Sequence, residues 1–213
     1  MKTDDLINAL AAQPQAVNAH AVEQRFALAA LAGVGGAAVL MVAFYGLLPG
    51  LAQTMALAMF WGKLLFAAAL AVGGLAVVRR LARPGWAVGR MAAALAAPPL
   101  VLWALALAAL VLAAPQDRLG LVLGSTWRTC PFNIAFLSMP ALAGFFWALR
   151  GAAPTRPALA GAAAGLLAGA LGALVYALHC PEMAAPCLAV WYVAGMVLPT
   201  RLGAVLGPRL LRW

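Results

Sequence analysis

A short polar stretch, residues 179–187, holds most of the groups in this chain that could do chemistry. It contains two of the three cysteines and one of the two histidines, and it lies between two long apolar runs. Imidazole, thiol, carboxylate and thioether groups occur together at His179, Cys180, Glu182, Met183 and Cys187. Thiolate and thioether sulfurs favour soft ions such as Cu(I), and two thiols can form a disulfide. The stretch is therefore a candidate for metal binding or redox chemistry.

The composition of the chain indicates a membrane protein. Of its 213 residues, 66% are hydrophobic and 9% are charged, whereas soluble domains are about 25% charged. Runs of about 20 apolar residues are typical of membrane-spanning helices, and we predict such spans at residues 26–48, 55–78, 91–114, 132–149, 157–178 and 187–206. The predicted fold class is all-α: a polytopic membrane protein with a six-transmembrane-helix bundle.

The basic residues predict the orientation of this bundle, because positive residues collect in the cytoplasmic loops of membrane proteins. The strongest cluster lies between the second and third predicted spans and consists of Arg79, Arg80, Arg83 and Arg90. The net charge of +9 is spread over such loops and does not form a nucleic-acid-binding domain. Both termini are therefore predicted to be cytoplasmic. We expect an N-terminal cytoplasmic segment at 1–25, a transmembrane domain at 26–206 and a cytoplasmic tail at 207–213.

This topology places Cys130, Cys180 and Cys187 at the outer face of the membrane. In a bacterium that face meets the oxidising periplasm, where disulfides persist. Three functional interpretations remain open: a structural disulfide between Cys130 and Cys180, a redox switch that uses the same pair, and a metal site. The metal site would draw on Cys130, His179, Cys180 and Met183, with Cys187 as a further ligand. A fourth alternative is that the thiols are buried and inert.

Lys63 is the only lysine or arginine well inside a predicted span. A charge at this depth is costly and marks a functional site by default. Because Lys63 lies in the outer half of its span, its side chain could also extend to the interface or make a structural bond.

The first 25 residues are the only sizeable polar segment. Asp4 and Asp5 stand where the positive end of a helix dipole would favour them. Leu6, Ile7 and Leu10 follow on one face at helical spacing. Two functions fit such a helix: an amphipathic anchor that lies on the membrane, and a helix whose apolar face docks on a soluble partner.

Five motifs, spread over essentially the whole chain, together resemble one known family. They are the N-terminal sequence at 1–7, the Trp-x-x-Cys element at 127–130, the Tyr-Ala-Leu-His-Cys-Pro-Glu loop at 176–182, the Trp-Tyr pair at 191–192 and the C-terminal sequence at 207–213. The chain resembles the NrsF-type family, six-span inner-membrane anti-sigma factors of proteobacteria. The His-Cys-Pro-Glu loop and the C-terminus are the most specific of these motifs.

The resemblance implies a regulatory function without enzymatic activity in the bacterial inner membrane. The N-terminal segment, with the two acids and three apolar residues named above, would bind an extracytoplasmic-function sigma factor and keep it from RNA polymerase. The protein would then contact its sigma factor and the lipid bilayer, and would make no direct contact with nucleic acid.

The resemblance also assigns signal sensing to two family cysteines, which map to Cys130 and Cys180. The family is linked to heavy-metal stress, and copper is the signal we favour. No permanent cofactor is implied, only a transient Cu(I) or other soft ion. His179, Glu182 and Cys187 join the pair as predicted sensing residues. Cys187 lies outside the family pattern and offers a third ligand or a competing disulfide partner.

Two alternatives from other functional classes remain open. A membrane thiol oxidoreductase that passes electrons to quinone would need a Cys-x-x-Cys pair or a close equivalent, and the sequence has none. A small exporter subunit would show polar groups along several spans, and Lys63 and Asn133 offer little of this.

Overall fold

The computed structural model describes residues 3, 5, 20–83, 85, 89–152 and 154–212. Throughout this part of the chain the regular structure is helical, and no strand occurs in it. The all-α class predicted from the apolar runs is thus confirmed. Most of the predicted N-terminal segment, including Asp4, Leu6, Ile7 and Leu10, lies outside the described residues.

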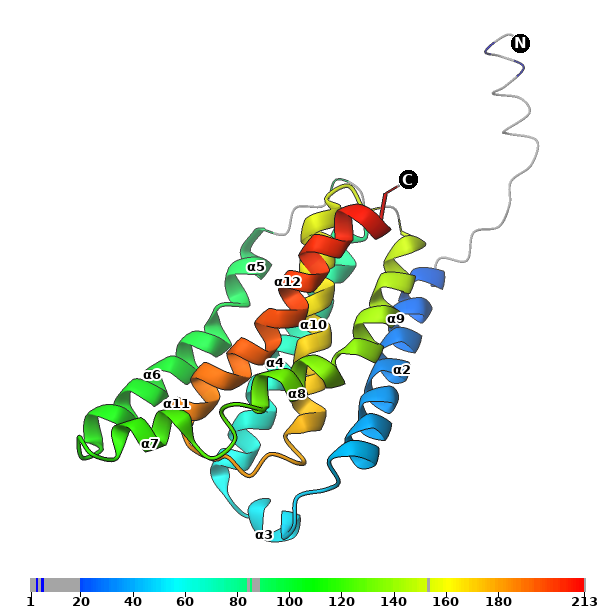
Figure 1. Ribbon diagram of the computed structural model, residues 1–213. Helices are drawn as coiled ribbons and strands as arrows, with labels where there is room; N and C mark the ends of the chain where they lie inside the picture. The colour runs from blue at the N-terminus through cyan, green and yellow to red at the C-terminus, as the bar shows by residue number, and fades with distance from the viewer. Residues whose placement is uncertain are drawn as a thin grey trace.

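Long apolar helices form a bundle (Figure 1). They are α2 (Ala21–Phe44), α4 (Ala58–Leu81), α5 (Gly89–Ala94) with α6 (Ala97–Leu112), α8 (Cys130–Leu137) with α9 (Met139–Arg150), α10 (Pro157–Tyr176), and α11 (Ala185–Cys187), which continues through the π-helical turn Leu188–Tyr192 into α12 (Val193–Leu210). Two short helices, α3 (Leu51–Thr54) and α7 (Arg118–Leu123), connect them. Among the described residues, five of these segments are long and apolar enough to cross a membrane, and the α8–α9 pair is a sixth if it counts as one span.

Two of the segments are interrupted, and proline lies beside each break. Helix α6 carries Pro98 and Pro99 in its first turn, directly after the gap that separates it from α5. Helices α8 and α9 meet at Ser138 with a bend of 40°, and Pro140 follows in the first turn of α9. A proline lacks the N–H that would continue the ladder, so each bend lies where a helical hydrogen bond is lost.

The helices extend beyond the apolar runs that predicted them. Helix α2 begins at Ala21, before the predicted start of the first span at 26. Helix α12 continues to Leu210, so the predicted boundary between the last span and the tail falls inside a helix. Hydropathy identifies only the residues that are apolar enough for the hydrocarbon core of a membrane. The helical hydrogen bonds can continue into polar residues beyond that core.

The connections divide between two ends of the bundle. Figure 1 shows α3, α7 and the loop before α11 at one end, and the end of α4, the start of α5, the end of α9, the start of α2 and the end of α12 at the other. The three cysteines belong to the first end, and the arginine cluster, which begins in the last turn of α4, belongs to the second. We call these the cysteine end and the arginine end.

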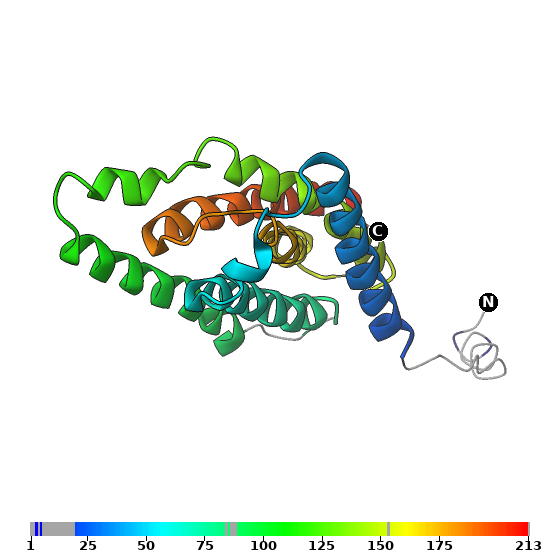
Figure 2. The same cartoon turned by 90° about the horizontal axis from the view of Figure 1, so that it is seen from below.

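Helix α10 lies in the middle of the bundle, with α2, α4, α8, α9 and α12 packed around it (Figure 2). Its closest neighbour is α12, because glycines on both helices let the backbones touch. A Cβ atom added at Gly203 of α12 would collide with the carbonyl of Gly161, and one added at Gly165 of α10 would collide with the carbonyl of Pro199. Small residues permit this close approach of apolar helices.

We predict that Gly203→Ala destabilises the protein by about 1–3 kcal/mol, because the added methyl group meets backbone that has no room to shift. Gly35→Ala in α2 is the matched control, since a Cβ there has nothing within 4 Å and should cost nothing. Thermal unfolding of the purified protein in detergent measures both. Equal melting temperatures for the two variants would contradict the packing described for α10 and α12.

Candidate functional site

Two of the three cysteines meet at the cysteine end of the bundle. Cys130 is the first residue of α8, and Cys180 lies in the loop that follows α10. Both side chains are buried, both are free thiols, and the two sulfurs lie within hydrogen-bonding reach of each other. Residues 50 positions apart in the sequence thus form a thiol pair. The geometry suits a shared proton, a disulfide or the binding of one soft ion.

Two tyrosines surround this thiol pair. The rings of Tyr176 and Tyr192 lie 5.9 Å apart between centroids, and Tyr176 is within hydrogen-bonding reach of Cys130. The Tyr192 hydroxyl lies beside the Cys180 sulfur, yet no well-aligned hydrogen bond satisfies it within the described structure. Tyr192 closes the π-helical turn, and such turns are frequent at functional sites. Sequence analysis missed both tyrosines, although each belongs to a motif that resembled the family.

The side chain of Lys63 extends from α4 to the loop that carries Cys180. Its side chain is only 1% exposed, and its ammonium donates a hydrogen bond of 2.7 Å to the backbone carbonyl of Cys180. The ring centroid of Phe60 lies 5.3 Å from the Nζ atom. Of the alternatives that the sequence left open for Lys63, the structure shows the structural bond.

The environment of Cys180 favours its thiolate form. A hydrogen bond from the Cys130 thiol is the main cause that lowers the pKa of Cys180, and the backbone N–H of Glu182 and the nearby Lys63 ammonium act in the same direction. Burial opposes them, because a charged group loses hydration in a low dielectric. The thiolate is the nucleophile and the metal ligand, so the contact places a group that can ionise against a second thiol.

Glu182 clamps the loop that carries Cys180 to the turn before α8. One carboxylate oxygen accepts hydrogen bonds from the backbone N–H and hydroxyl of Ser125, both at 2.6 Å, and from the backbone N–H of Thr126 at 3.2 Å. Gly124 makes room for the clamp, since a Cβ there would lie 2.7 Å from the other carboxylate oxygen. Gly124 also has a φ of +60°, which disfavours any side chain. The clamp therefore holds the loop of Cys180 and the turn before Cys130 in one arrangement.

The remaining predicted ligands make other contacts. The Cys187 thiol lies beside the clamp and points to the carbonyl of Leu123 at 3.7 Å. His179 Nδ1 lies 3.1 Å from the carbonyl of Gly46, and its ring packs against Tyr45 and Tyr176.

Among the described residues, no three His, Cys, Asp or Glu side chains converge as metal ligands would. Met183 is half-buried in the same loop. The predicted metal set of Cys130, His179, Cys180 and Met183 stays a prediction, and its two thiols are the members that the structure brings together.

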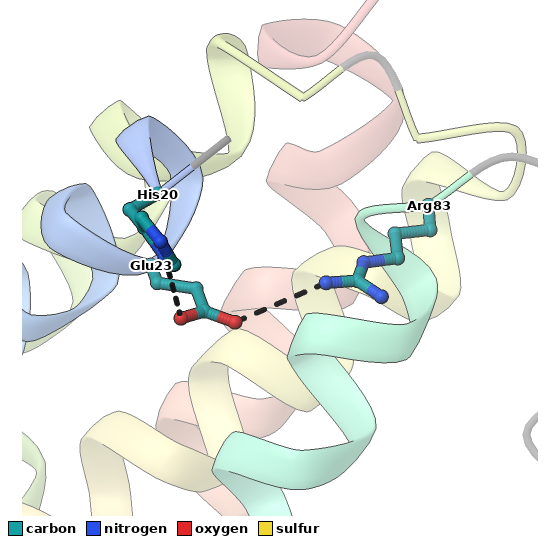
Figure 3. A network of polar contacts seen from close by, with 3 residues as sticks. All are labelled: His20, Glu23 and Arg83. Carbon is teal, nitrogen blue, oxygen red and sulfur yellow. Dashed lines mark ion pairs between the residues drawn. The ribbon is translucent and has the colours of Figure 1, made fainter. Parts of the chain in front are cut away.

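The arginine end carries a small polar network around Glu23 in the first turn of α2 (Figure 3). One Glu23 carboxylate oxygen lies 3.9 Å from Arg83 Nη2, and the other lies 3.8 Å from His20 Nδ1. The network joins the start of α2 to the end of α4. Sequence analysis missed it, although the three-residue spacing of His20 and Glu23 signals a helical pair. Of the predicted partner-binding residues, only Asp5 is described, and it is exposed.

Comparison with known proteins gives matches over nearly the full length. The model of the NrsF family, described as "Negative regulator of sigma F", matches residues 10–213. The "Probable anti-sigma-F factor NrsF" of Azospira oryzae is 47% identical over 213 residues, with 100% of both chains covered. The "Anti-sigma-F factor NrsF" of Caulobacter vibrioides is 42% identical over 225 aligned positions, again with 100% of both chains covered. No solved structure matches the chain.

We predict that Glu182→Ala opens the turn before α8, because three donors lose their carboxylate acceptor and hydrogen bonds to charged groups contribute about 1.5–3 kcal/mol. Hydrogen–deuterium exchange at Ser125 and Thr126 should speed up by at least about tenfold. Asp117→Ala, which removes another acid at the same end without such a clamp, should leave their exchange unchanged. The same exchange in wild-type protein and Glu182→Ala would show that the clamp does not hold the turn.

Proposed function

Because the chain belongs to the NrsF family of negative regulators of sigma F, we propose that it holds a sigma factor inactive at the bacterial inner membrane and releases it when two outer cysteines meet their signal. The family is regulatory rather than enzymatic. The observation that supports the proposed sensing role is the buried contact between the thiols of Cys130 and Cys180. Two reactive groups from distant segments are brought together there, at the end of the bundle opposite the start of α2.

The proposed topology has six spans with both termini in the cytoplasm. Five long apolar helices and the bent α8–α9 pair supply the spans. The arginine end carries the positive charge expected of a cytoplasmic face, and α2 begins and α12 ends there. The cysteine end then faces the periplasm, and the N-terminal segment lies on the side where sigma factors act.

The proposed partner is a sigma factor of the extracytoplasmic-function class. The names of two full-length relatives support a sigma factor, and the resemblance to the NrsF-type family implies its class. The docking face is assigned to Leu6, Ile7 and Leu10, with Asp4 and Asp5 beside it. An apolar stripe of this kind is a common way for a short helix to bind a groove on a partner.

The proposed signal acts on the two thiols directly. A soft ion, with Cu(I) favoured, would bind both sulfurs as thiolates and release their two protons. Alternatively, a two-electron oxidant would take two electrons and two protons as the S–S bond forms. Either event changes how the start of α8 sits against the end of α10. His179 and Glu182 hold the loop in which this happens, and Cys187 lies beside it.

The change can reach the N-terminal segment through packed helices. Helix α8 continues into α9 after the 40° bend, and α9 packs along α2. A shift of α8 would therefore move the helix that leads to the sigma-binding segment. Ligand binding that favours one of two helix packings is sufficient to drive such a switch.

We predict that Cys130→Ser and Cys180→Ser each abolish induction of the target genes by copper, because one sulfur alone cannot form the two-thiol site. Cys187→Ser is the matched control and should keep the response, since its thiol points to the Leu123 carbonyl. A reporter gene in cells that produce each variant at equal level gives the measurement. A wild-type response in both Cys130→Ser and Cys180→Ser would place the sensor elsewhere.

We predict that Leu6→Asp with Leu10→Asp releases the sigma factor without any signal. Each leucine that loses its burial costs about 1.5–3 kcal/mol, so the affinity should fall by about 100-fold or more. Co-purification of the sigma factor with the detergent-solubilised protein measures this loss. Asn8→Asp with Ala12→Asp adds the same charge to the opposite helix face and should leave binding intact. Equal retention of the sigma factor by both double variants would refute the assigned docking face.

A further inference from the structure

Lys63 carries a charge into the interior of the bundle without forming an ion pair with a described carboxylate. The side chain is buried, and the Glu182 carboxylate acts on it only as a more distant charge. An ammonium taken out of water is expensive unless its surroundings compensate it. A methionine of similar length would fill the same space without this penalty, so the charge calls for a purpose beyond packing.

The ammonium has one specific polar partner, and that partner belongs to the thiol pair. Lys63 Nζ donates to the carbonyl oxygen of Cys180 at 2.7 Å. A charge-assisted hydrogen bond of this length is stronger than a neutral one. The face of the Phe60 ring, 5.3 Å from Nζ, adds a cation–π contact on the apolar side.

The bond fixes the residue whose orientation matters most for the thiol contact. Residues before and after Cys180 are held by other hydrogen bonds. The carbonyl of Leu178 accepts from the N–H of Leu48 at 3.1 Å, and the Glu182 carboxylate accepts from the N–H of Ser125. Between them, the carbonyl of Cys180 is held by Lys63. A peptide plane that cannot rotate also fixes the direction of the adjoining Cα–Cβ bond, and hence the position of the sulfur.

We propose that Lys63 is the positioning residue of the sensor, and that its ammonium holds the Cys180 carbonyl so that the Cys180 thiol stays against Cys130. The inference rests on the proposed function in that this thiol pair is taken as the sensor. The contact itself is a property of the resting protein. Lys63 positions Cys180 through its backbone carbonyl, and this contact is separate from the effect of the Lys63 charge on the Cys180 thiol.

The test is the rate at which the two thiols form a disulfide in purified full-length protein in detergent, with Cys187→Ser as the background. Diamide serves as the oxidant and accepts two electrons and two protons as the S–S bond forms. Thiol labelling after timed quenching measures the disulfide. We expect Lys63→Met to slow its formation by about tenfold, because the hydrogen bond from a charged donor is lost. Lys63→Gln keeps a donor and should restore most of the rate.

Controls separate positioning from general damage. Leu65→Met on the same helix changes a side chain that is 71% exposed and should leave the rate unchanged. The melting temperature of Lys63→Met should stay near that of the wild type, because replacing a buried charge by an apolar residue is often neutral. If Lys63→Met aggregates, Lys63→Leu takes its place. A wild-type rate in either folded variant overturns the proposal, and so does a Lys63→Gln rate as slow as that of Lys63→Met.

The outcome does not depend on sigma-factor binding or on the response in cells, because the assay uses the purified protein alone. If Cys130→Ser and Cys180→Ser still respond to copper in cells, the sensing role fails, and the effect of Lys63 on disulfide formation can still be found. If Lys63→Met leaves disulfide formation unchanged while both cysteine variants lose the response, only the role of Lys63 fails.

Discussion

Close contact between helix backbones around α10 is the constraint on which the rest of this structure depends. Helix association in lipid gains little from hydrophobicity and relies on packing of small residues. Gly161 and Gly165 bring α12 against α10, and Gly172 does the same for α8, since a Cβ there would lie 2.9 Å from the carbonyl of Ile134. Gly172 is one turn before Tyr176, where α10 ends. The thiol contact at the cysteine end follows from how near α8 can come.

The half-buried loop after α10 is held at the end of the bundle by hydrogen bonds. Its backbone and side-chain polar groups find their partners on three other segments. The turn after α2 binds Leu178 and His179, α4 binds Cys180 through Lys63, and the turn before α8 binds Glu182. A loop held from several sides changes its arrangement as a unit, which suits a switch between discrete states.

Sequence patterns predicted the fold class and the residue types at the site, but few of the contacts between those residues. Apolar runs located the long helices, and the positions of the arginine clusters placed the three cysteines at one end of the bundle. The partners of Lys63 and Glu182 were not predictable, since they are backbone groups of Cys180, Ser125 and Thr126 and any residue type provides those. The contact of Cys130 with Cys180 is the exception, because the sequence analysis named this pair and the structure brings the two thiols together.

Two of the connections between α2 and the rest of the bundle differ greatly in strength. The ion pair between Glu23 and Arg83 is exposed and 3.9 Å long, and such pairs contribute about 0–1 kcal/mol. Along α9, by contrast, a Cβ at Gly33 would lie 2.6 Å from Ala141, and one at Gly144 would lie 3.2 Å from the carbonyl of Ala29. The buried rings of Phe26 and Phe145 stack 6.3 Å apart in the same interface. Close packing does not deform gradually, so α2 must follow α9, whereas the ion pair can break and reform as it moves.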